Sequence, residues 1–267
     1  MKAFARALTD DLGRLPLLRE PLSLAYGFYF SRVSGYRRLF KGVYPDFAGA
    51  TRAVPHGGTV GYDNEASAWR LVHERRTIFP HDYPVMFWLS RLLDEATALF
   101  DWGGNVGNSY LAYRMHLPYP DGLTWIVNDV PAVVAVGRKL AAEEDAPNLL
   151  FTTDFTALEK ADILLAAGSL QFIDNPYAPL RAASARPRHV LLNKVPVYDK
   201  PSAVTLQNMG TAFVPNHLFS RAEIVGNFKS LGYRLVDAWS NPGLGCYIPF
   251  HPAHSIKAYS GFYFIRS

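Results

Sequence analysis

The most informative stretch of the sequence for chemistry is FDWGGNVGNSY, in which a lone carboxylate, Asp101, is followed by three glycines. If residues 97–102 form a buried strand and a helix begins near Asn108, a tight turn lies at the carboxyl end of that strand. Its backbone is supplied by Gly103, Gly104, Asn105, Val106 and Gly107. Ligands of open α/β sheets bind at such turns, because glycine lets a ligand approach the backbone closely. The residues therefore predict a ligand site lined by backbone.

The glycine spacing excludes two common phosphate-binding patterns. A G-x-G-x-x-G pattern that began at Gly103 would need glycines at the positions of Asn105 and Asn108. A G-x-x-x-x-G-K-[ST] loop would need a lysine after its last glycine, and none follows here. An oxidoreductase that uses a nicotinamide cofactor is therefore disfavoured, although we keep it as an alternative.

The turn resembles that of the class I S-adenosylmethionine-dependent methyltransferases, whose loop reads [DE]-x-G-x-G-x-G. Asp101 matches the acid, Gly103 and Gly107 match two glycines, and Asn105 replaces the central one. Asparagine is among the few residues that tolerate left-handed backbone geometry. S-adenosylmethionine carries an ammonium and a sulfonium but no phosphate, so a carboxylate attracts it where a pyrophosphate would be repelled.

A second acid, Asp129, follows the apolar segment TWIV. If residues 124–129 are the next strand, this carboxylate can accept hydrogen bonds from both hydroxyls of a ribose. The segment NDVP, which includes Val130, is similar to the DLP of many O-methyltransferases, and the resemblance implies that Asp129 is the ribose carboxylate. A helix N-cap ahead of Pro131 is the structural alternative, and the two roles can coexist.

The resemblance also implies further cofactor contacts. Asp154 and Phe155 stand where relatives place an acid and an apolar residue around the adenine, with an ordinary loop as the alternative. Gly168 and Ser169 follow the fourth expected strand and are expected near the methionine portion of the cofactor. Tyr62 precedes a helical segment near the N-terminus, and we interpret it as part of a lid over the same end.

The methyl acceptor is predicted to meet the long connection of residues 193–221, since long loops inside a compact domain are usually functional. His217 is the candidate general base because imidazole titrates near neutral pH, with a structural hydrogen bond as the alternative. Tyr198 is assigned to catalysis with it. The side chains expected to bind the acceptor are Asn193, Lys194, Gln207 and Asn208. No metal site is expected.

The elements that position these residues follow from apolar runs separated by helical segments. Strands are expected at residues 97–102, 124–129, 149–154, 162–168, 189–194 and 234–239. A seventh, residues 259–265, follows a connection with little helical character and is expected to pair antiparallel in the edge region. Pro131 favours a helix start, and Ser220 with Glu223 forms a capping box. The pattern predicts an α/β, Rossmann-like class I methyltransferase fold with a mostly parallel seven-stranded sheet.

Residues 1–95 lack buried-strand runs, and we expect a helical N-terminal extension or lid there, followed by the Rossmann-like domain over residues 96–267. The stretch SLAYGFYFSRVSGYRRLF mixes aromatic residues with arginines. Such mixing suits nucleic acid or an anionic membrane surface. We favour a lid face or a homodimer contact, because the overall charge is moderate.

Composition narrows the function classes. The chain has 267 residues, 49% of them apolar, and a formal net charge of +4, which does not favour a nucleic-acid partner. A single cysteine, Cys246, excludes an intramolecular disulfide and a zinc site built on several thiolates. No transmembrane run or signal peptide is recognisable, so the expected location is the cytoplasm.

The segments DWGGNVG, LNKVPVY, TLQNMGTAFVPNH and YSGFYF also resemble a bacterial family of methyltransferases over most of residues 60–267. The resemblance implies the fold and S-adenosylmethionine as cofactor, without fixing the acceptor. The predicted function is methyl transfer to an oxygen or nitrogen of a small molecule or sugar. A non-catalytic cofactor-binding or scaffolding protein is the main alternative, and an RNA methyltransferase is disfavoured because no RNA-binding module is recognisable.

Overall fold

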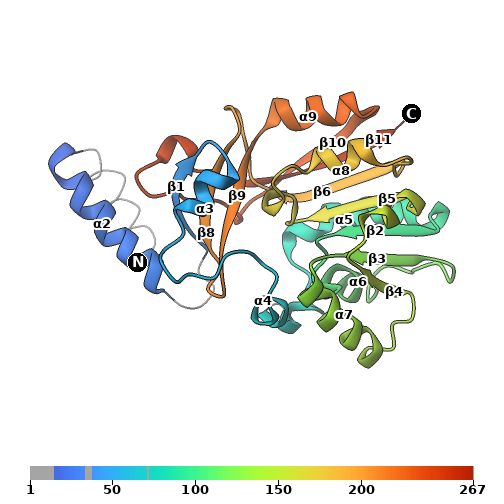
Figure 1. Ribbon diagram of the computed structural model, residues 1–267. Coiled ribbons are helices and arrows are strands. Elements are labelled where there is room, and N and C mark those ends of the chain that lie inside the picture. The colour runs from blue at the N-terminus through green and yellow to red at the C-terminus, as the bar shows by residue number, and fades with distance from the viewer. Residues whose placement is uncertain (1–14, 34–37, 71, 267) are drawn as a thin grey trace.

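A seven-stranded sheet lies at the centre of the computed structural model, which describes residues 15–33, 38–70 and 72–266. Its strand order is β10-β11-β6-β5-β2-β3-β4 (Figure 1). The strands are β2 (Ala98–Trp102), β3 (Thr124–Asn128), β4 (Leu149–Thr152), β5 (Ile163–Ala167), β6 (His189–Val195), β10 (Tyr233–Asn241) and β11 (Tyr259–Arg266). All seven expected strands are therefore present.

Five neighbouring strands pair in parallel, and their order reverses at β2, which pairs with β3 on one side and β5 on the other. The expected antiparallel strand is β11, which pairs with both β6 and β10. It lies second from the edge, with β10 outside it. Such an order leaves a crevice beyond the carboxyl ends of β2 and β5, where ligands of α/β folds bind.

Helices cover both faces of the sheet (Figure 1). On one face lie α5 (Tyr83–Leu92), α6 (Asn108–Tyr113) and α7 (Pro131–Glu143), and on the other α8 (Tyr177–Ala182) and α9 (Arg221–Ser230). Because side chains alternate along a strand, Leu99 packs into the apolar cluster under α5, α6 and α7, and Phe100 packs into the cluster under α8 and α9. Both are fully buried, which fixes the register of β2 and the position of the turn that follows it.

Local sequence signals set the starts of the two longer covering helices, as expected. Pro131 is the first residue of α7, where its missing N–H costs no hydrogen bond. Ser220 is the N-cap of α9, and its Oγ accepts a hydrogen bond from the backbone N–H of Glu223. The second half of the predicted capping box does not form, because the Glu223 carboxylate accepts from Ser202 and the Ser220 N–H donates to Oγ of Ser202. The short 3₁₀ helices are η2 (Val72–Glu74), η3 (Pro80–Asp82), η4 (Leu93–Glu95), η5 (Phe155–Lys160), η6 (Leu170–Phe172) and η7 (Pro252–His254).

The connection after β6 is not the loop that the sequence predicted. It forms most of a second sheet of order β1-β8-β9-β7, with strands β1 (Leu39–Tyr44), β7 (Val197–Tyr198), β8 (Ala203–Asn208) and β9 (Phe213–Ser220). Strands β8 and β9 form an antiparallel hairpin around Gly210, whose φ is 83°. Runs of β-branched and aromatic residues on either side of a glycine turn are the sequence signal for this hairpin.

The N-terminal part of the chain contributes helices α2 (Pro16–Arg32), α3 (Phe47–Arg52) and α4 (Glu65–Arg70) together with strand β1. Strand β1 pairs with β8, so the N-terminal part shares a sheet with the chain after β6. Residues 34–37 of the aromatic and basic stretch lie outside the described residues. A domain boundary near residue 95 and a homodimer contact stay predictions.

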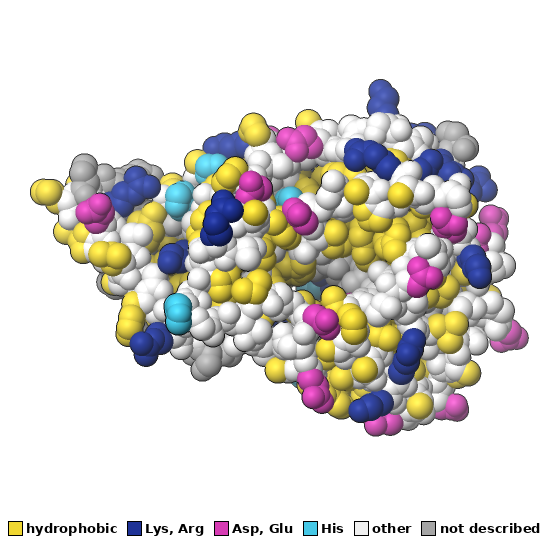
Figure 2. Space-filling view, in the orientation of Figure 1, with side chains coloured by type: hydrophobic (Ala, Val, Ile, Leu, Met, Phe, Trp, Pro, Cys, Tyr) yellow, Lys and Arg dark blue, Asp and Glu magenta, His cyan; other side chains and the backbone are white. Residues whose placement is uncertain are grey.

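The displayed surface carries scattered charge. In Figure 2, Lys and Arg side chains are interspersed with Asp and Glu rather than gathered into one patch on that face. Among the described residues, no helix is long and apolar enough to cross a membrane.

Candidate active site

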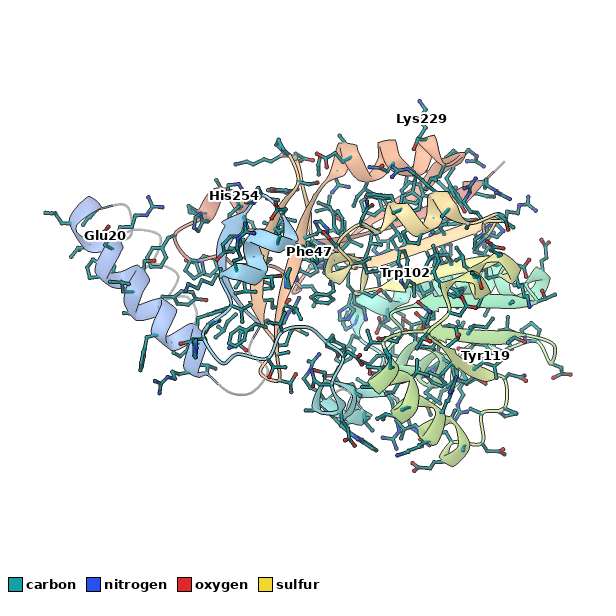
Figure 3. All side chains as sticks on the ribbon, in the orientation of Figure 1. Glu20, Phe47, Trp102, Tyr119, Lys229 and His254 are labelled. Atoms are coloured by element: carbon teal, nitrogen blue, oxygen red, sulfur yellow. The ribbon has the colours of Figure 1, made fainter. Side chains whose placement is uncertain are left out.

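A cavity of about 890 Å³ lies between the carboxyl ends of the parallel strands and the second sheet. Its volume is near the upper end of the roughly 300–1,000 Å³ found for small-molecule sites. Phe47 of α3 and Trp102 of β2, both labelled in Figure 3, line it from opposite sides. We call the wall made by Asp101, residues 103–105, Asn108, Asp129 and residues 168–169 the glycine-turn half. The wall made by Arg38, Phe79, His81, Asp82, Lys194, Gln207 and Val214 is the second-sheet half.

The glycine turn adopts a backbone that few other residues could adopt. The φ angles of Gly103 and Gly107 are 70° and 85°, and that of Asn105 is 55°, so asparagine occupies the left-handed position without breaking the turn. A Cβ atom on Gly104 would lie 2.5 Å from Oδ2 of Asp101. The replacement of the motif's central glycine by Asn105 therefore preserves the shape of the cradle.

Asp101 lies beneath this turn and is fully buried. Its Oδ2 accepts a hydrogen bond of 3.1 Å from Nε1 of Trp125, whereas its Oδ1 has no hydrogen-bond partner among the described residues. Burial raises the pKa of Asp101 to about 7, against the opposing effect of the Trp125 hydrogen bond. A buried carboxylate with one unsatisfied oxygen favours a cationic ligand group nearby.

Asp129 ties the end of β3 to the glycine turn. Its Oδ2 accepts from the backbone N–H of Asn105 at 2.9 Å, and its Oδ1 accepts from that of Val130 at 2.8 Å. Burial raises its pKa to about 6, although both backbone hydrogen bonds act in the opposite direction. Each oxygen keeps a second lone pair, so the carboxylate can still accept hydrogen bonds from a ligand.

The segment around Tyr62 packs onto the turn. The Tyr62 hydroxyl accepts hydrogen bonds of 3.1 Å from Nδ2 of Asn105 and from an Nη of Arg70. Its neighbour Asp63 accepts a hydrogen bond of 2.9 Å from the backbone N–H of Ala132, in the first turn of α7. Tyr62 lines the cavity, so the structure brings this N-terminal segment to the predicted place.

Gly168 and Ser169 complete the glycine-turn half at the end of β5. The Ser169 hydroxyl donates a hydrogen bond to the carbonyl of Trp102, which fastens the two strand ends together. A Cβ atom on Gly103 would lie 2.3 Å from Cβ of Ser169, so this close approach requires glycine. The cavity lining includes Asp101, Gly103, Gly104, Asn105, Asp129, Val130, Gly168, Ser169 and Tyr62 among the predicted cofactor residues.

Three predicted cofactor residues do not line the cavity. Asp154 is exposed and caps η5, since its carboxylate accepts hydrogen bonds from the backbone N–H and the hydroxyl of Thr156. Phe155 packs against Phe100 and Trp102 in the apolar core. Gly107 lies below the turn, where an added Cβ would meet the Leu149 side chain at 2.7 Å. Strand β4 ends at Thr152, which places Asp154 too far along the chain.

Neither predicted catalytic residue lines the cavity. Nε2 of His217 donates a hydrogen bond of 2.9 Å to the carbonyl of Asp174, and the His217 ring contacts the rings of Phe47 and Phe219. Burial lowers its pKa. The hydroxyl of Tyr198 donates to the carbonyl of Pro201 at 2.7 Å. The structure places both side chains outside this cavity, because the expected loop is made of strands whose side chains alternate between two faces. Their catalytic roles stay predictions.

The predicted acceptor residues divide in two. Lys194 and Gln207 line the cavity. Asn193 is buried, donates to the carbonyl of His81 and accepts from Trp239 and Asn241, so its amide is used within the fold. Asn208 likewise bonds to the backbone of α2 and the β8–β9 turn. The acceptor roles of Asn193 and Asn208 stay predictions that the structure does not favour, because both amides are used for contacts within the fold.

The second-sheet half contains residues that the sequence did not single out, above all Asp82. Nζ of Lys194 lies 3.0 Å from Oδ1 of this buried aspartate, and Oδ2 accepts from the backbone N–H of Phe79 at 2.9 Å. Nε2 of His81 lies 3.9 Å from the same Oδ1. Burial and the charge of Lys194 lower the pKa of His81 to about 4, so its ring is neutral at pH 7. The tripeptide PHD before a helix was the available signal.

No protein-family model matches the sequence, and no curated protein matches it. Among solved structures, the chain is similar to one in the complex between the Haloferax volcanii Trm112 methyltransferase activator and a protein named there as a methyltransferase. The identity is 15%, the match covers 77% of this chain and 97% of that chain, and the TM-score is 0.53.

Two further structures are similar at a lower TM-score of 0.47. The Burkholderia thailandensis 1,6-didemethyltoxoflavin-N1-methyltransferase, with S-adenosylhomocysteine bound, is 15% identical over 76% of this chain and 87% of its own. The magnesium protoporphyrin IX methyltransferase of Synechocystis PCC 6803, also with S-adenosylhomocysteine, is 18% identical over 78% and 90%. The sheet order and the similarity to the structure in the Haloferax volcanii complex show that the chain has the Rossmann-like fold of class I methyltransferases.

Proposed function

We propose that the chain is an S-adenosylmethionine-dependent methyltransferase that acts on an oxygen or nitrogen of a small molecule. One observation carries the proposal: Asp101 and Asp129, at the ends of neighbouring parallel strands, line a single cavity on either side of a glycine turn. Two carboxylates suit a ligand with an ammonium, a sulfonium and a ribose. The same pair would repel the pyrophosphate of a nicotinamide cofactor.

The residues of the glycine-turn half fit this cofactor. The unsatisfied Oδ1 of Asp101 suits its ammonium group, and the remaining lone pairs of Asp129 suit the ribose hydroxyls. Val130 and Thr153 line the cavity beyond Asp129, and we assign to them the apolar and polar surroundings of the adenine in place of Phe155 and Asp154. When bound, S-adenosylmethionine supplies an electrophilic methyl group on its sulfonium.

Orientation of the two reactants is expected to carry most of the rate enhancement. Holding reacting groups in line supplies roughly 7–11 kcal/mol, whereas a general base supplies about 3–5 kcal/mol. The imidazole of His81 is neutral at pH 7 and can accept a proton, but its pKa of about 4 makes it a weak base. The walls of the second-sheet half orient the acceptor and exclude water from the site.

The test compares cofactor classes on the purified wild-type protein. Titration calorimetry and thermal shift are measured with S-adenosylhomocysteine, NAD⁺ and adenosine. We expect S-adenosylhomocysteine to bind in the micromolar range and to raise the melting temperature more than either other compound. Stabilisation by NAD⁺ alone would refute the proposal and favour the oxidoreductase, and binding of no nucleoside compound would favour the scaffolding alternative.

A further inference from the structure

The second-sheet half carries an excess of positive charge. Arg38 and Lys194 are its cations, and Asp82 is its carboxylate. Lys194 and Asp82 form an ion pair at 3.0 Å, which neutralises both. His81 lies beside them as a neutral ring. One guanidinium charge, that of Arg38, therefore remains on this wall of the cavity.

Arg38 is held in place without a carboxylate partner. Its backbone is left-handed, with φ of 51°, and its guanidinium lies over the ring of Tyr259 at 5.3 Å. Its Nε is buried and has no hydrogen-bond partner among the described residues, which also contain no carboxylate within 4 Å of its guanidinium. A buried N–H without a partner costs free energy comparable to a lost hydrogen bond, so a ligand that satisfies it gains affinity. A guanidinium presents a planar fork that matches carboxylate and phosphate oxygens.

The charge lies among flat and apolar walls. The ring of Phe79 stacks on that of His81, with centroids 5.3 Å apart and an interplanar angle of 7°. Further apolar side chains on the lining are Phe47, Met209, Val214, Leu244 and Tyr259. Such a surface favours the body of an aromatic or otherwise apolar molecule over a strongly hydrated sugar.

We propose that the methyl acceptor is an apolar or aromatic molecule with one anionic group, a carboxylate or a phosphate, which binds to the guanidinium of Arg38. The inference rests on the proposed function, because it treats the second-sheet half as the acceptor site. It replaces the sugar acceptor with an organic acid or phosphate ester.

The experiment uses small probes for the two anion types. Benzoate, phenyl phosphate and neutral benzamide are titrated calorimetrically into the full-length protein, with and without saturating S-adenosylhomocysteine. We expect benzoate or phenyl phosphate to bind at least about tenfold more tightly than benzamide. The tighter of the two identifies the anion as carboxylate or phosphate.

Two variants separate the role of Arg38 from general effects on the fold. Arg38→Met keeps most of the apolar stem and is expected to weaken binding of the preferred anion roughly tenfold or more, with S-adenosylhomocysteine affinity unchanged. Arg38→Lys keeps the charge and should retain part of the affinity. The control is Arg52→Met, at an exposed position of α3 that does not line the cavity, and it should bind like wild type.

The binding data distinguish a failure of the anionic-acceptor proposal from a failure of the proposed function. Equal binding of benzoate, phenyl phosphate and benzamide by wild type, or an unchanged anion affinity in Arg38→Met, would overturn the anionic-acceptor proposal even if S-adenosylhomocysteine binds. If the wild-type protein does not bind S-adenosylhomocysteine but binds the anion in a way that depends on Arg38, the proposed function would be overturned and the anion site would be supported.

Discussion

The two halves of the cavity are built in different ways. The glycine-turn half comes from the ends of adjacent parallel strands, and its backbone and two carboxylates are fixed by hydrogen bonds such as that between Asp129 and Asn105. The second-sheet half gathers side chains from parts of the chain as far apart as Arg38, Asp82 and Lys194. Its geometry rests on the ion pair between Lys194 and Asp82, the hydrogen bond from Phe79 to Asp82 and the stacking of Phe79 on His81.

This difference suggests a division of labour. A backbone-lined cradle holds a constant ligand, because its shape depends on φ angles and close approaches that tolerate few substitutions at the glycines. Walls built from side chains can change by substitution without disturbing the central sheet. We therefore expect cofactor binding to depend on the first half and acceptor choice on the second.

Gly104→Ala is expected to disrupt the glycine-turn half more than any other substitution considered. The added Cβ would lie 2.5 Å from Oδ2 of Asp101, so the turn or the carboxylate must shift. We expect a loss of roughly 100-fold or more in S-adenosylhomocysteine affinity, measured by calorimetry. Gly122→Ala is the matched control, because an added Cβ there meets no atom within 4 Å. Equal affinities in the two variants would contradict the role of the turn.

In the second-sheet half, His81 should make the free energy of unfolding fall at acidic pH. Its folded-state pKa of about 4 lies below the ordinary 6.5, so the unfolded chain takes up the proton first as the pH falls. The resulting stability is fully present above pH 6.5 and is lost as the pH falls towards 4. Urea denaturation of His81→Gln should show a flatter decline over this range.

The control for that measurement is His73→Gln, since the side chain of His73 is 75% exposed. It should follow the wild-type curve. If His81→Gln also followed the wild-type curve, the close contact between His81, Asp82 and Lys194 would be wrong.

Affinity for S-adenosylhomocysteine should rise with pH. Burial raises the pKa of Asp101 to about 7, and a ligand ammonium favours the ionised carboxylate, so binding strengthens as Asp101 loses its proton. The slope below pH 7 is at most about tenfold per pH unit, and the curve levels off above about pH 8. Asp129, with a pKa of about 6, adds a further decline at lower pH. Asp101→Asn should flatten the upper part of the curve, and a wild-type affinity independent of pH would count against the ammonium contact.

The smallest expected effect lies outside both halves. Ser220→Ala removes the N-cap of α9 and should lower the free energy of unfolding by about 1 kcal/mol. Cofactor affinity should not change, because no residue of α9 lines the cavity. A drop in affinity would mean that the two halves are coupled through the helices that cover the sheet.

Sequence reasoning recovered the first half because its signals are local. Buried runs predicted the strands, the glycines marked the turn, and Asp129 was placed beside it by one β-α-β step. The prediction that Asp154 lies at the same site differs from the structure, because β4 ends two residues before Asp154 and its carboxylate caps η5. One or two residues at a strand end decide whether a side chain faces the cavity.

The second half could not be predicted in the same way. Its residues meet through long-range contacts, such as the pairing of β1 with β8 between segments more than 150 positions apart, which no local pattern encodes. The hairpin of β8 and β9 had a local signal around Gly210, but the polar residues nearby were interpreted as a loop. The imidazole of His217 was consequently assigned to a site from which β9 turns it away.

The most direct test of the central claim is calorimetric binding of S-adenosylhomocysteine to Asp129→Ala and Asp154→Ala, measured beside wild type. Asp129 lines the cavity and holds the turn, whereas Asp154 is exposed and lies outside it. We predict that Asp129→Ala loses about 10- to 100-fold in affinity and that Asp154→Ala binds like wild type. Undiminished binding by Asp129→Ala would contradict the account.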